Sequence, residues 1–305
     1  MSADFQYAFT VFTPTYNRAH LLPRVYECLQ NQTFRDFEWL IVDDGSTDNT
    51  CDVVKPWVED PAIRVRYIAQ PNRGKHTAVN RGAKEAAGRF FANLDSDDWY
   101  VPHALERFVH HWNQIPAAAQ ATFAGVVGLV ARPSGEVVGT RFPKDVFDSD
   151  PVELRYRHKV QGDKNGMLRT DVMREFPFPE NIGKFIPESV VWNRMAKAYK
   201  TRFINEALMI ADYQQTGLSA TAQTIQVQNA RASLLASREL IDLGNRLPMG
   251  ARVRAYANYV RHSLHERVPF TTILADAPSK MMLCLCGPIG AFLKSRDTRR
   301  LRGHA

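Results

Sequence analysis

The first hundred residues alternate between two kinds of hydrophobic pattern. Four short apolar runs, rich in β-branched and aromatic residues, have the length and composition of β-strands; they cover residues 9–13, 37–42, 63–67 and 90–94. Between the runs, apolar residues recur every three or four positions, as on the buried face of a helix; they are Leu22, Val25, Tyr26 and Leu29, then Val53, Val54, Trp57 and Val58, then Val79, Ala83, Ala86 and Ala87. The pattern predicts strands and helices in alternation.

This alternation predicts an α/β fold with a doubly wound, mostly parallel sheet. Parallel strands need helical crossovers, and such sheets bind ligands beyond the carboxyl ends of their strands. Three predicted strand ends carry polar loops, "TPTYNR" at 13–18, "DDGSTD" at 43–48 and "DSDD" at 95–98. We expect these loops to converge on one edge of the sheet.

The second half of the chain gives a weaker pattern. We interpret the Gly-rich polar stretch at 160–180 as a connection, and the stretch at 216–224, "TGLSATAQT", as a linker. Helical patterns follow up to residue 268. We therefore expect an α/β domain over residues 1–215 and a helical C-terminal extension over residues 216–305.

The extension ends in an apolar run, residues 281–293, followed by a basic tail. Thirteen residues are too few to span a bilayer, and we expect Gly287 and Pro288 to break the run. An apolar patch beside basic residues can hold a protein on an anionic membrane face, here through residues 281–302. The alternative is a packing segment that ends in a solvated tail, and the sequence leaves both open.

Composition excludes some classes of function. With 45% hydrophobic positions in 305 residues the chain can bury a large core, which excludes a disordered protein. The formal charge of +7 would suit nucleic acid, an anionic membrane or a phosphorylated substrate. Its basic residues are scattered and no aromatic and basic stacking motif emerges, which argues against a nucleic-acid partner.

Cysteine usage and the N-terminus favour the cytoplasm. The four cysteines form neither the framework of a secreted disulfide protein nor a C-x-x-C pair. No basic segment followed by a long apolar stretch opens the chain, so we expect no signal peptide. If the basic tail binds lipid, the protein would lie on the inner face of the membrane.

The stretch "DSDD" places Asp95, Asp97 and Asp98 within four positions. Like charges so close repel one another and raise their pKa values unless a cation or hydrogen-bond donors compensate. Mg²⁺ or Mn²⁺ would do so, because these ions prefer carboxylate oxygen and complete their shells with water and substrate phosphate. The alternative is an acidic turn, just as "DDGSTD" could be a simple helix cap.

Two long stretches, residues 9–48 and 74–102, together resemble the family 2 glycosyltransferases. The first contains "TPTYNR" and "DDGSTD", and the second contains "GKHTAVNRGAKEAAG" and "NLDSDDWYVP", in family order and spacing. The resemblance implies a GT-A fold, a nucleotide-sugar donor and a metal-binding D-x-D motif. It would make residues 1–215 the catalytic domain.

The resemblance also implies the residues that bind the donor. Pro14 and Tyr16 would line the base pocket, Asp44 would contact the nucleotide base, and Lys75 would lie near the donor. UDP is the favoured nucleotide through the resemblance alone.

Within the D-x-D motif, the resemblance assigns a role to each position. Asp95 would approach the ribose or a metal-bound water, Ser96 is the middle residue, and Asp97 would ligate the metal that bridges the two phosphates. Asp98 falls just outside the motif.

The resemblance implies an inverting transfer, in which a carboxylate deprotonates an acceptor hydroxyl of a glycan or lipid-linked acceptor. Residues 177–210 offer Glu180 and Glu188. We choose Glu188, because it opens a predicted helix after Pro187, although Ser189 stands where the family often has aspartate. The alternative is that Glu188 only interacts with the helix dipole.

Two other classes of protein remain open. One is a non-catalytic protein that binds a nucleotide-sugar. The other is a nucleotidyltransferase of related fold. A Gly-rich triphosphate loop near residue 15 would favour it, and "TPTYNRAH" contains no glycine, which counts against it.

Overall fold

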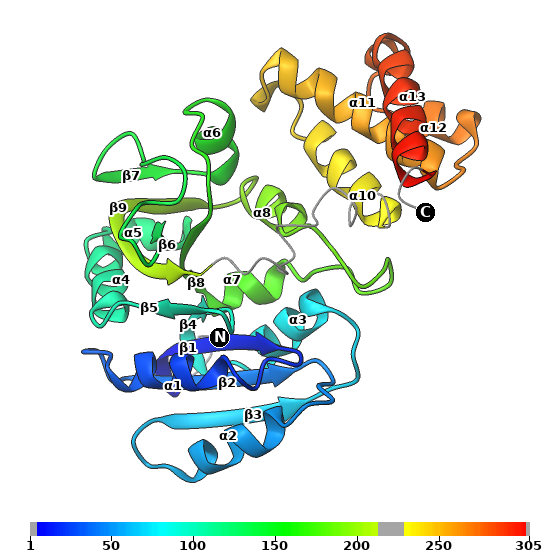
Figure 1. The fold of residues 1–305 in the computed structure, drawn as a ribbon. Helices are drawn as coiled ribbons and strands as arrows, with labels where there is room; N and C mark the ends of the chain where they lie inside the picture. Colours follow the sequence, from blue (N-terminus) through cyan, green and yellow to red (C-terminus); the bar gives the residue numbers. More distant parts are fainter. Residues whose placement is uncertain (1–4, 213–228, 303–305) are drawn as a thin grey trace. The chain divides into compact units, whose positions relative to one another are not determined.

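The computed structural model describes residues 5–212 and 229–302, and the predicted linker at 216–224 lies outside them. The chain divides into two compact units (Figure 1). The α/β unit contains Met1–Phe178 and Ala198–Gln214, and the helical unit contains Pro179–Lys197 and Gln215–Ala305. The chain therefore leaves the α/β unit after residue 178 and returns to it at residue 198.

One sheet collects the strands of the described residues. They are β1 (Tyr7–Thr15), β2 (Phe37–Asp43), β3 (Arg64–Ala69), β4 (Gly88–Asn93), β5 (Asp98–Tyr100), β6 (Phe123–Ala131), β7 (Val146–Ser149), β8 (Lys164–Arg169) and β9 (Lys200–Ala211). Their order is β3-β2-β1-β4-β8-β6-β9-β5, with β7 paired to β9. β3, β2, β1 and β4 are parallel, as are β6 and β9, whereas β8, β5 and β7 run antiparallel to their partners. The predicted mostly parallel α/β fold is confirmed.

Helices flank the sheet of the α/β unit, and all but the shortest of them bury residues. They are α1 (Leu22–Gln30), α2 (Thr50–Glu59), α3 (Lys75–Glu85), α4 (Ala104–Asn113), α5 (Ala117–Gln120), α6 (Pro151–Tyr156) and α7 (Thr170–Glu175). Every residue of β2 is buried, so this strand is covered on both faces, as central parallel strands are. Trp39 of β2 stacks on Tyr26 of α1 and on Trp57 of α2, which joins both helices to the sheet.

The stretch that we interpreted as a connection contains a strand instead. β8 lies between β4 and β6, and its sequence, "KNGMLR", has no apolar run to indicate a strand. Position 166 requires glycine and not the apolar residue typical of a strand, because a Cβ there would lie 2.1 Å from the carbonyl oxygen of Val126. The close approach of two backbones required glycine, which is an ordinary loop indicator in a sequence.

The helical unit consists of α8 (Ser189–Met195), α10 (Ala230–Ile241), a 3₁₀ turn (Gly244–Arg246), α11 (Met249–His265), α12 (Phe270–Asp276) and α13 (Lys280–Arg302). The expected helical C-terminal region is confirmed. Arg194 of α8 forms an ion pair with Glu239 of α10 (2.7 Å), and Tyr256, Tyr259 and Leu283 belong to a core of the unit's own.

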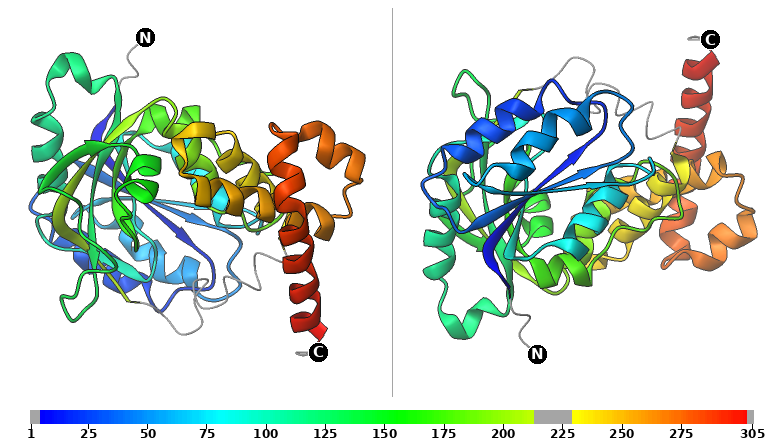
Figure 2. Two further views of the ribbon diagram at one scale, coloured as in Figure 1. Left: turned by 90° about the horizontal axis from the view of Figure 1, so that it is seen from above. Right: turned by 90° about the horizontal axis from the view of Figure 1, so that it is seen from below.

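The expected break at Gly287 and Pro288 is wrong, since α13 is one continuous helix (Figure 2). Proline removes the hydrogen bond to the carbonyl of Cys284, but both residues are exposed, so water can hydrate that carbonyl. On the opposite face, Cys286 and Gly290 are buried on either side of the proline. Packing of this buried face therefore stabilises the helix on both sides of Pro288. Within residues 5–212 and 229–302, no helix has the length and apolar character needed to cross a membrane.

Candidate functional site

The carboxyl ends of β1, β2 and β4 meet at one edge of the sheet, because β1 pairs in parallel with both of the others. The loops after β1 and β2 are joined there by direct hydrogen bonds. Asn17, at φ 52°, accepts through Oδ1 from the backbone N–H of Thr47 (2.7 Å), and Asp48 accepts from the N–H of Ala19 (3.1 Å). The first two polar loops thus lie against each other, as their placement at strand ends predicts.

Pro14 and Tyr16, predicted to line the base pocket, differ in exposure. Pro14 is a buried residue of β1, whereas Tyr16 follows the strand and is 47% exposed, unusual for a large aromatic residue. An exposed ring at a strand end can stack on a planar group. The base contact itself stays a prediction.

Asp44, the predicted base contact, is buried and makes hydrogen bonds to the loop after β3. Its carboxylate accepts from the side chain of Gln70 (2.8 Å) and from the backbone N–H groups of Arg73 (3.0 Å) and Gly74 (2.7 Å). Gly74 has φ 102°, which favours glycine, and the next residue, Lys75, begins α3. In this structure Asp44 therefore fixes the turn that places Lys75.

Lys75 lies beside the D-x-D motif. Its ammonium forms an ion pair with Asp95 (2.7 Å), and the Asn93 amide donates to the same carboxylate (3.1 Å). Burial alone would raise the pKa of Asp95, but the charge and hydrogen bond of Lys75, with help from Asn93, hold the pKa below its usual range. Asp95 is therefore ionised at neutral pH.

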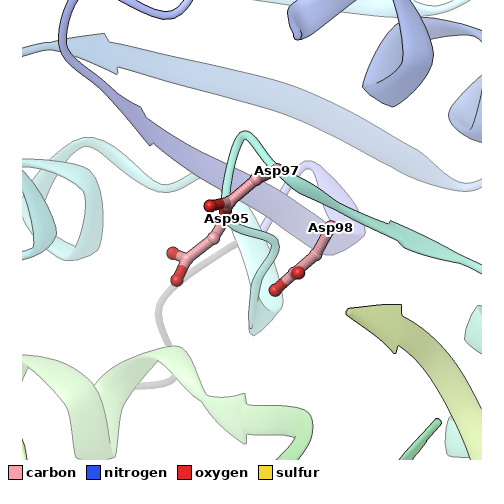
Figure 3. A group of neighbouring side chains, drawn as sticks. All are labelled: Asp95, Asp97 and Asp98. Carbon is pink, nitrogen blue, oxygen red and sulfur yellow. The ribbon is translucent and has the colours of Figure 1, made fainter. Parts of the chain in front are cut away.

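The structure brings three carboxylates together at the β4–β5 loop (Figure 3). Asp95, Asp97 and Asp98 each offer one oxygen, and these three oxygens lie within 4.8 Å of one another. Ser96, between the first two, is buried. The N–H of Asp98 donates to the carbonyl of Asp95 (3.1 Å), a turn that brings the third carboxylate back to the first. Sequence reasoning left Asp98 outside the motif because this turn is not visible in the residue spacing.

The acidic cluster has more negative charge than its neighbours compensate. Burial, together with the charges of Asp95 and Asp97, raises the pKa of Asp98 to about 8. Three clustered carboxylate oxygens are the donor set that hard divalent cations such as Mg²⁺ and Mn²⁺ prefer. The residues present therefore fit such an ion, although they do not distinguish one metal from the other.

Sequence reasoning missed Arg24, a residue of α1 that supports the acidic loop. Its guanidinium donates to the backbone carbonyl of Asp97 (2.5 Å), pairs with Asp212 (3.2 Å) and lies 4.2 Å from the centre of the Trp99 ring. These contacts hold the loop between β4 and β5 against the end of β9. An arginine in an amphipathic helix gives no hint of such a role in the sequence.

Glu188 is the predicted site residue that lies outside the α/β unit. It belongs to the helical unit, is exposed, and precedes α8, where its carbonyl accepts from the N–H groups of Val191 (3.0 Å) and Trp192 (3.2 Å). The structure thus brings together Pro14, Tyr16, Asp44, Lys75, Asp95, Ser96 and Asp97 at the strand ends of one unit. The role of Glu188 as a base stays a prediction.

A doubly wound sheet with a D-x-D cluster after its fourth strand has the architecture of GT-A glycosyltransferases. The model of the family named glycosyl transferase family 2 matches residues 10–175, more than half of the 305 residues. The chain therefore belongs to glycosyltransferase family 2.

Curated relatives match over the first part of the chain. An uncharacterised glycosyltransferase of Mycoplasma pneumoniae is 36% identical over 113 residues, which are 36% of this chain and 38% of the relative. The GalNAc(5)-diNAcBac-PP-undecaprenol beta-1,3-glucosyltransferase of Campylobacter jejuni is 35% identical over 107 residues, 34% of each chain. The chain thus spans little more than a third of these relatives.

Solved structures resemble the whole chain in fold. Staphylococcus aureus TarS 1–349 in complex with UDP-GlcNAc has a TM-score of 0.61 at 18% identity, covering 97% of this chain and 92% of that one. The mannosyltransferase PcManGT of Pyrobaculum calidifontis, in complex with GDP-Man and Mn²⁺, has a TM-score of 0.54 at 17% identity, covering 97% and 81%. At these identities the likeness concerns the fold.

Proposed function

We propose that this protein is a metal-dependent, inverting glycosyltransferase that moves a sugar from a nucleoside-diphosphate donor to a hydroxyl group. The observation that carries the proposal is the acidic cluster of Asp95, Asp97 and Asp98 beside Lys75, at the strand ends where sheets of this kind bind ligands. The complexes of the two structural neighbours, with UDP-GlcNAc and with GDP-Man and Mn²⁺, support a nucleotide-sugar donor. We favour UDP.

Asp97 and Asp95 would hold Mn²⁺ or Mg²⁺, with the Asp98 carboxylate within reach of the same position. When bound, such an ion stabilises the negative charge that develops on the leaving nucleoside diphosphate. Lys75 places a second positive charge at this edge of the sheet. Both features suit a doubly charged leaving group without a general acid.

The remaining donor contacts follow from the strand-end loops. Tyr16 offers an exposed ring for the nucleotide base, and Pro14 lies two positions earlier, in β1. Asp44 keeps the turn before Lys75 in place through its three hydrogen bonds and would contact the base from the neighbouring loop. Ser96, the middle residue of the D-x-D motif, is buried between the two aspartates in the sequence.

Glu188 would act as the base that removes the proton of the acceptor hydroxyl, so that attack opposite the leaving group inverts the anomeric centre. Glu188 is an exposed residue that precedes α8. The acceptor would be a glycan or a lipid-linked sugar, as in cell-surface polysaccharide synthesis, because the name of the Campylobacter relative contains an undecaprenol-linked acceptor. We place the enzyme in the cytoplasm, at the inner face of the membrane when the acceptor is on a lipid.

Calorimetric titration of UDP and GDP, with and without Mn²⁺, tests the proposal. We expect one nucleotide to bind only with the metal, and Asp97→Asn to weaken that binding at least a hundredfold. Asp36→Asn is the matched control, because this aspartate precedes β2 at the opposite end of the strand from the site. A folded wild-type protein that binds neither nucleotide would contradict the donor site.

A binding protein and an enzyme give different results in a second assay. If a UDP-sugar binds but no sugar is released or transferred with any acceptor extract, the non-catalytic alternative holds. Release of pyrophosphate from a nucleoside triphosphate and a sugar phosphate would indicate a nucleotidyltransferase.

A further inference from the structure

The outer face of α13 is apolar and exposed. Met281, Leu285, Ile289 and Phe292 are 70%, 66%, 46% and 67% exposed. Their spacing of four, four and three residues puts them on one side of the helix. Together they expose on the order of 500 Å² of side chain, at the upper end of the patches that ordinary monomers show. We refer to these four residues as the α13 patch.

The opposite face of α13 is firmly packed, so the α13 patch is not a consequence of a loose helix. Cys286 is buried, and a Cβ at Gly290 would lie 2.6 Å from the carbonyl oxygen of Ala257, which shows how closely α13 approaches α11. Further along, Asp297 pairs with Arg261 of α11 (2.6 Å) and with His265 (3.0 Å). The helix therefore presents its outer face in a fixed orientation.

The charge along the same face is positive. Arg296 and Arg299, four and seven residues after Phe292, fall on the line of the α13 patch, and both are exposed. Asp297 is the acidic residue of α13, and it is buried on the inner face and paired. The outer face thus consists of an apolar half followed by a basic half.

We propose that this face of α13 docks on an anionic lipid surface. The four apolar side chains would enter the boundary between headgroups and acyl chains, while the two arginines contact lipid phosphates. A second copy of the chain fits less well, because a stable dimer buries about 800 Å² on each partner and does not require a basic continuation. The inference does not depend on the proposed glycosyl transfer, since no residue of the donor site takes part.

Flotation with vesicles tests this inference on the full chain without any nucleotide. We expect binding to phosphatidylcholine vesicles that contain about one third phosphatidylglycerol, weaker binding to pure phosphatidylcholine, and a decline with rising salt. Leu285→Asn with Phe292→Asn should lower the partition coefficient on the order of a hundredfold for both vesicle types. Arg296→Glu with Arg299→Glu should lower it on the order of thirtyfold or more for anionic vesicles only.

Matched controls come from α2 of the α/β unit. Val58→Asn replaces an exposed apolar residue and Lys55→Glu an exposed basic one, and both should leave vesicle binding unchanged. Equal binding by all variants would overturn the proposal, as would a wild-type chain that stays with the soluble fraction at low salt. If Leu285→Asn with Phe292→Asn instead converts a dimer to a monomer with no effect on flotation, the occupant is a second copy and the lipid assignment is wrong.

Discussion

The two units deal with apolar surface in opposite ways. Of the large hydrophobic side chains that are exposed among the described residues, Tyr16, Val58 and Val146 belong to the α/β unit. Twice as many belong to the smaller helical unit, namely Met249, Phe270, Met281, Leu285, Ile289 and Phe292. The α/β unit has buried its apolar surface within itself, whereas the helical unit still has apolar surface to cover.

Within the α/β unit, buried charge that is paired contrasts with charge that is clustered. In the α/β unit even the fully buried Glu38 is satisfied, since it accepts from Thr10 (2.6 Å), Arg66 (2.9 Å) and the N–H of Ala87 (2.7 Å). The exception is the acidic cluster, where three carboxylates share one loop. The two proposals rest on these contrasting features: the acidic cluster of the α/β unit, which we propose holds a cation, and the α13 patch of the helical unit, which we propose docks on lipid.

The largest expected effect concerns Glu188, because the proposed base belongs to the helical unit and not to the unit with the donor site. Glu188→Gln keeps the shape of the side chain but removes the base, so kcat should fall about 10²- to 10⁴-fold while the dissociation constant of the donor stays unchanged. Steady-state kinetics and donor titration measure the two quantities. Glu180→Gln is the matched control, and a loss of activity there with an unaffected Glu188→Gln would move the base to Glu180.

Two phenylalanines, one buried in the α/β unit and one exposed on the helical unit, test the difference in apolar surface. Phe9 is fully buried in β1, next to Phe34 and Phe90, whereas Phe292 is 67% exposed on α13. Phe9→Ala should lower the free energy of unfolding by about 3–5 kcal/mol, and Phe292→Ala by less than about 0.5 kcal/mol. Denaturant unfolding gives both values. A large loss for Phe292→Ala would mean that the α13 patch is covered by another part of the chain.

Arg24 tests whether the acidic loop needs support from outside the motif. Arg24→Met keeps an unbranched side chain but loses the bonds to the Asp97 carbonyl and to Asp212 and the guanidinium contact with Trp99, so donor affinity should fall about tenfold or more. The expected change is in KM for the donor more than in kcat, and Arg24→Lys should recover part of it. Arg35→Met, an exposed arginine after the same helix, should leave KM as it is.

The smallest expected effect is the dependence of stability on pH, which differs between the two units. In the helical unit, burial lowers the pKa of His262 to about 4, helped by Arg261 and His265 and opposed by Asp297. The imidazole is therefore neutral in the folded chain, and protonation favours the unfolded chain once the pH falls below the ordinary value of 6.5. Stability should fall by about 1 kcal/mol between pH 6.5 and 5.5.

In the α/β unit, the contribution of Glu206 to stability should be lost at lower pH. The hydrogen bond from Arg107, against burial and with help from His111, lowers the pKa of Glu206 to about 2. The stabilisation is present above the ordinary pKa of 4.5 and is lost as the pH falls from there toward 2. Calorimetric unfolding at several pH values should show the helical transition moving to lower temperature between pH 6.5 and 5.5, and His262→Asn should remove that shift. A simultaneous shift of both transitions to lower temperature between pH 6.5 and 5.5 would contradict the assignment.

The sequence predicted the first half of the fold well, because β1 to β4 and the helices between them are determined by local hydrophobic periodicity. It did not predict β8, whose Gly166 is required by the backbone of β6, or the continuity of α13, which depends on packing against α11. Motif residues such as Asp95 and Asp97 could be found for the same local reason. Arg24 could not, because its role depends on a contact between residues far apart in the chain, and the position of Asp98 could not, because it depends on a turn back to Asp95 that residue spacing does not reveal.

The pairing of β5 has a consequence for how the protein is made. β5 begins at Asp98, and in this sheet it pairs with β9, where Asp98 lies opposite Ala211. The ribosome therefore releases the acidic motif more than a hundred residues before the strand that holds it in place. β9 is also the partner of β6 and β7, so the pairing of these two strands depends on the same late segment. A nascent chain stopped before residue 200 would contain the complete D-x-D motif without the strand that pairs with Asp98.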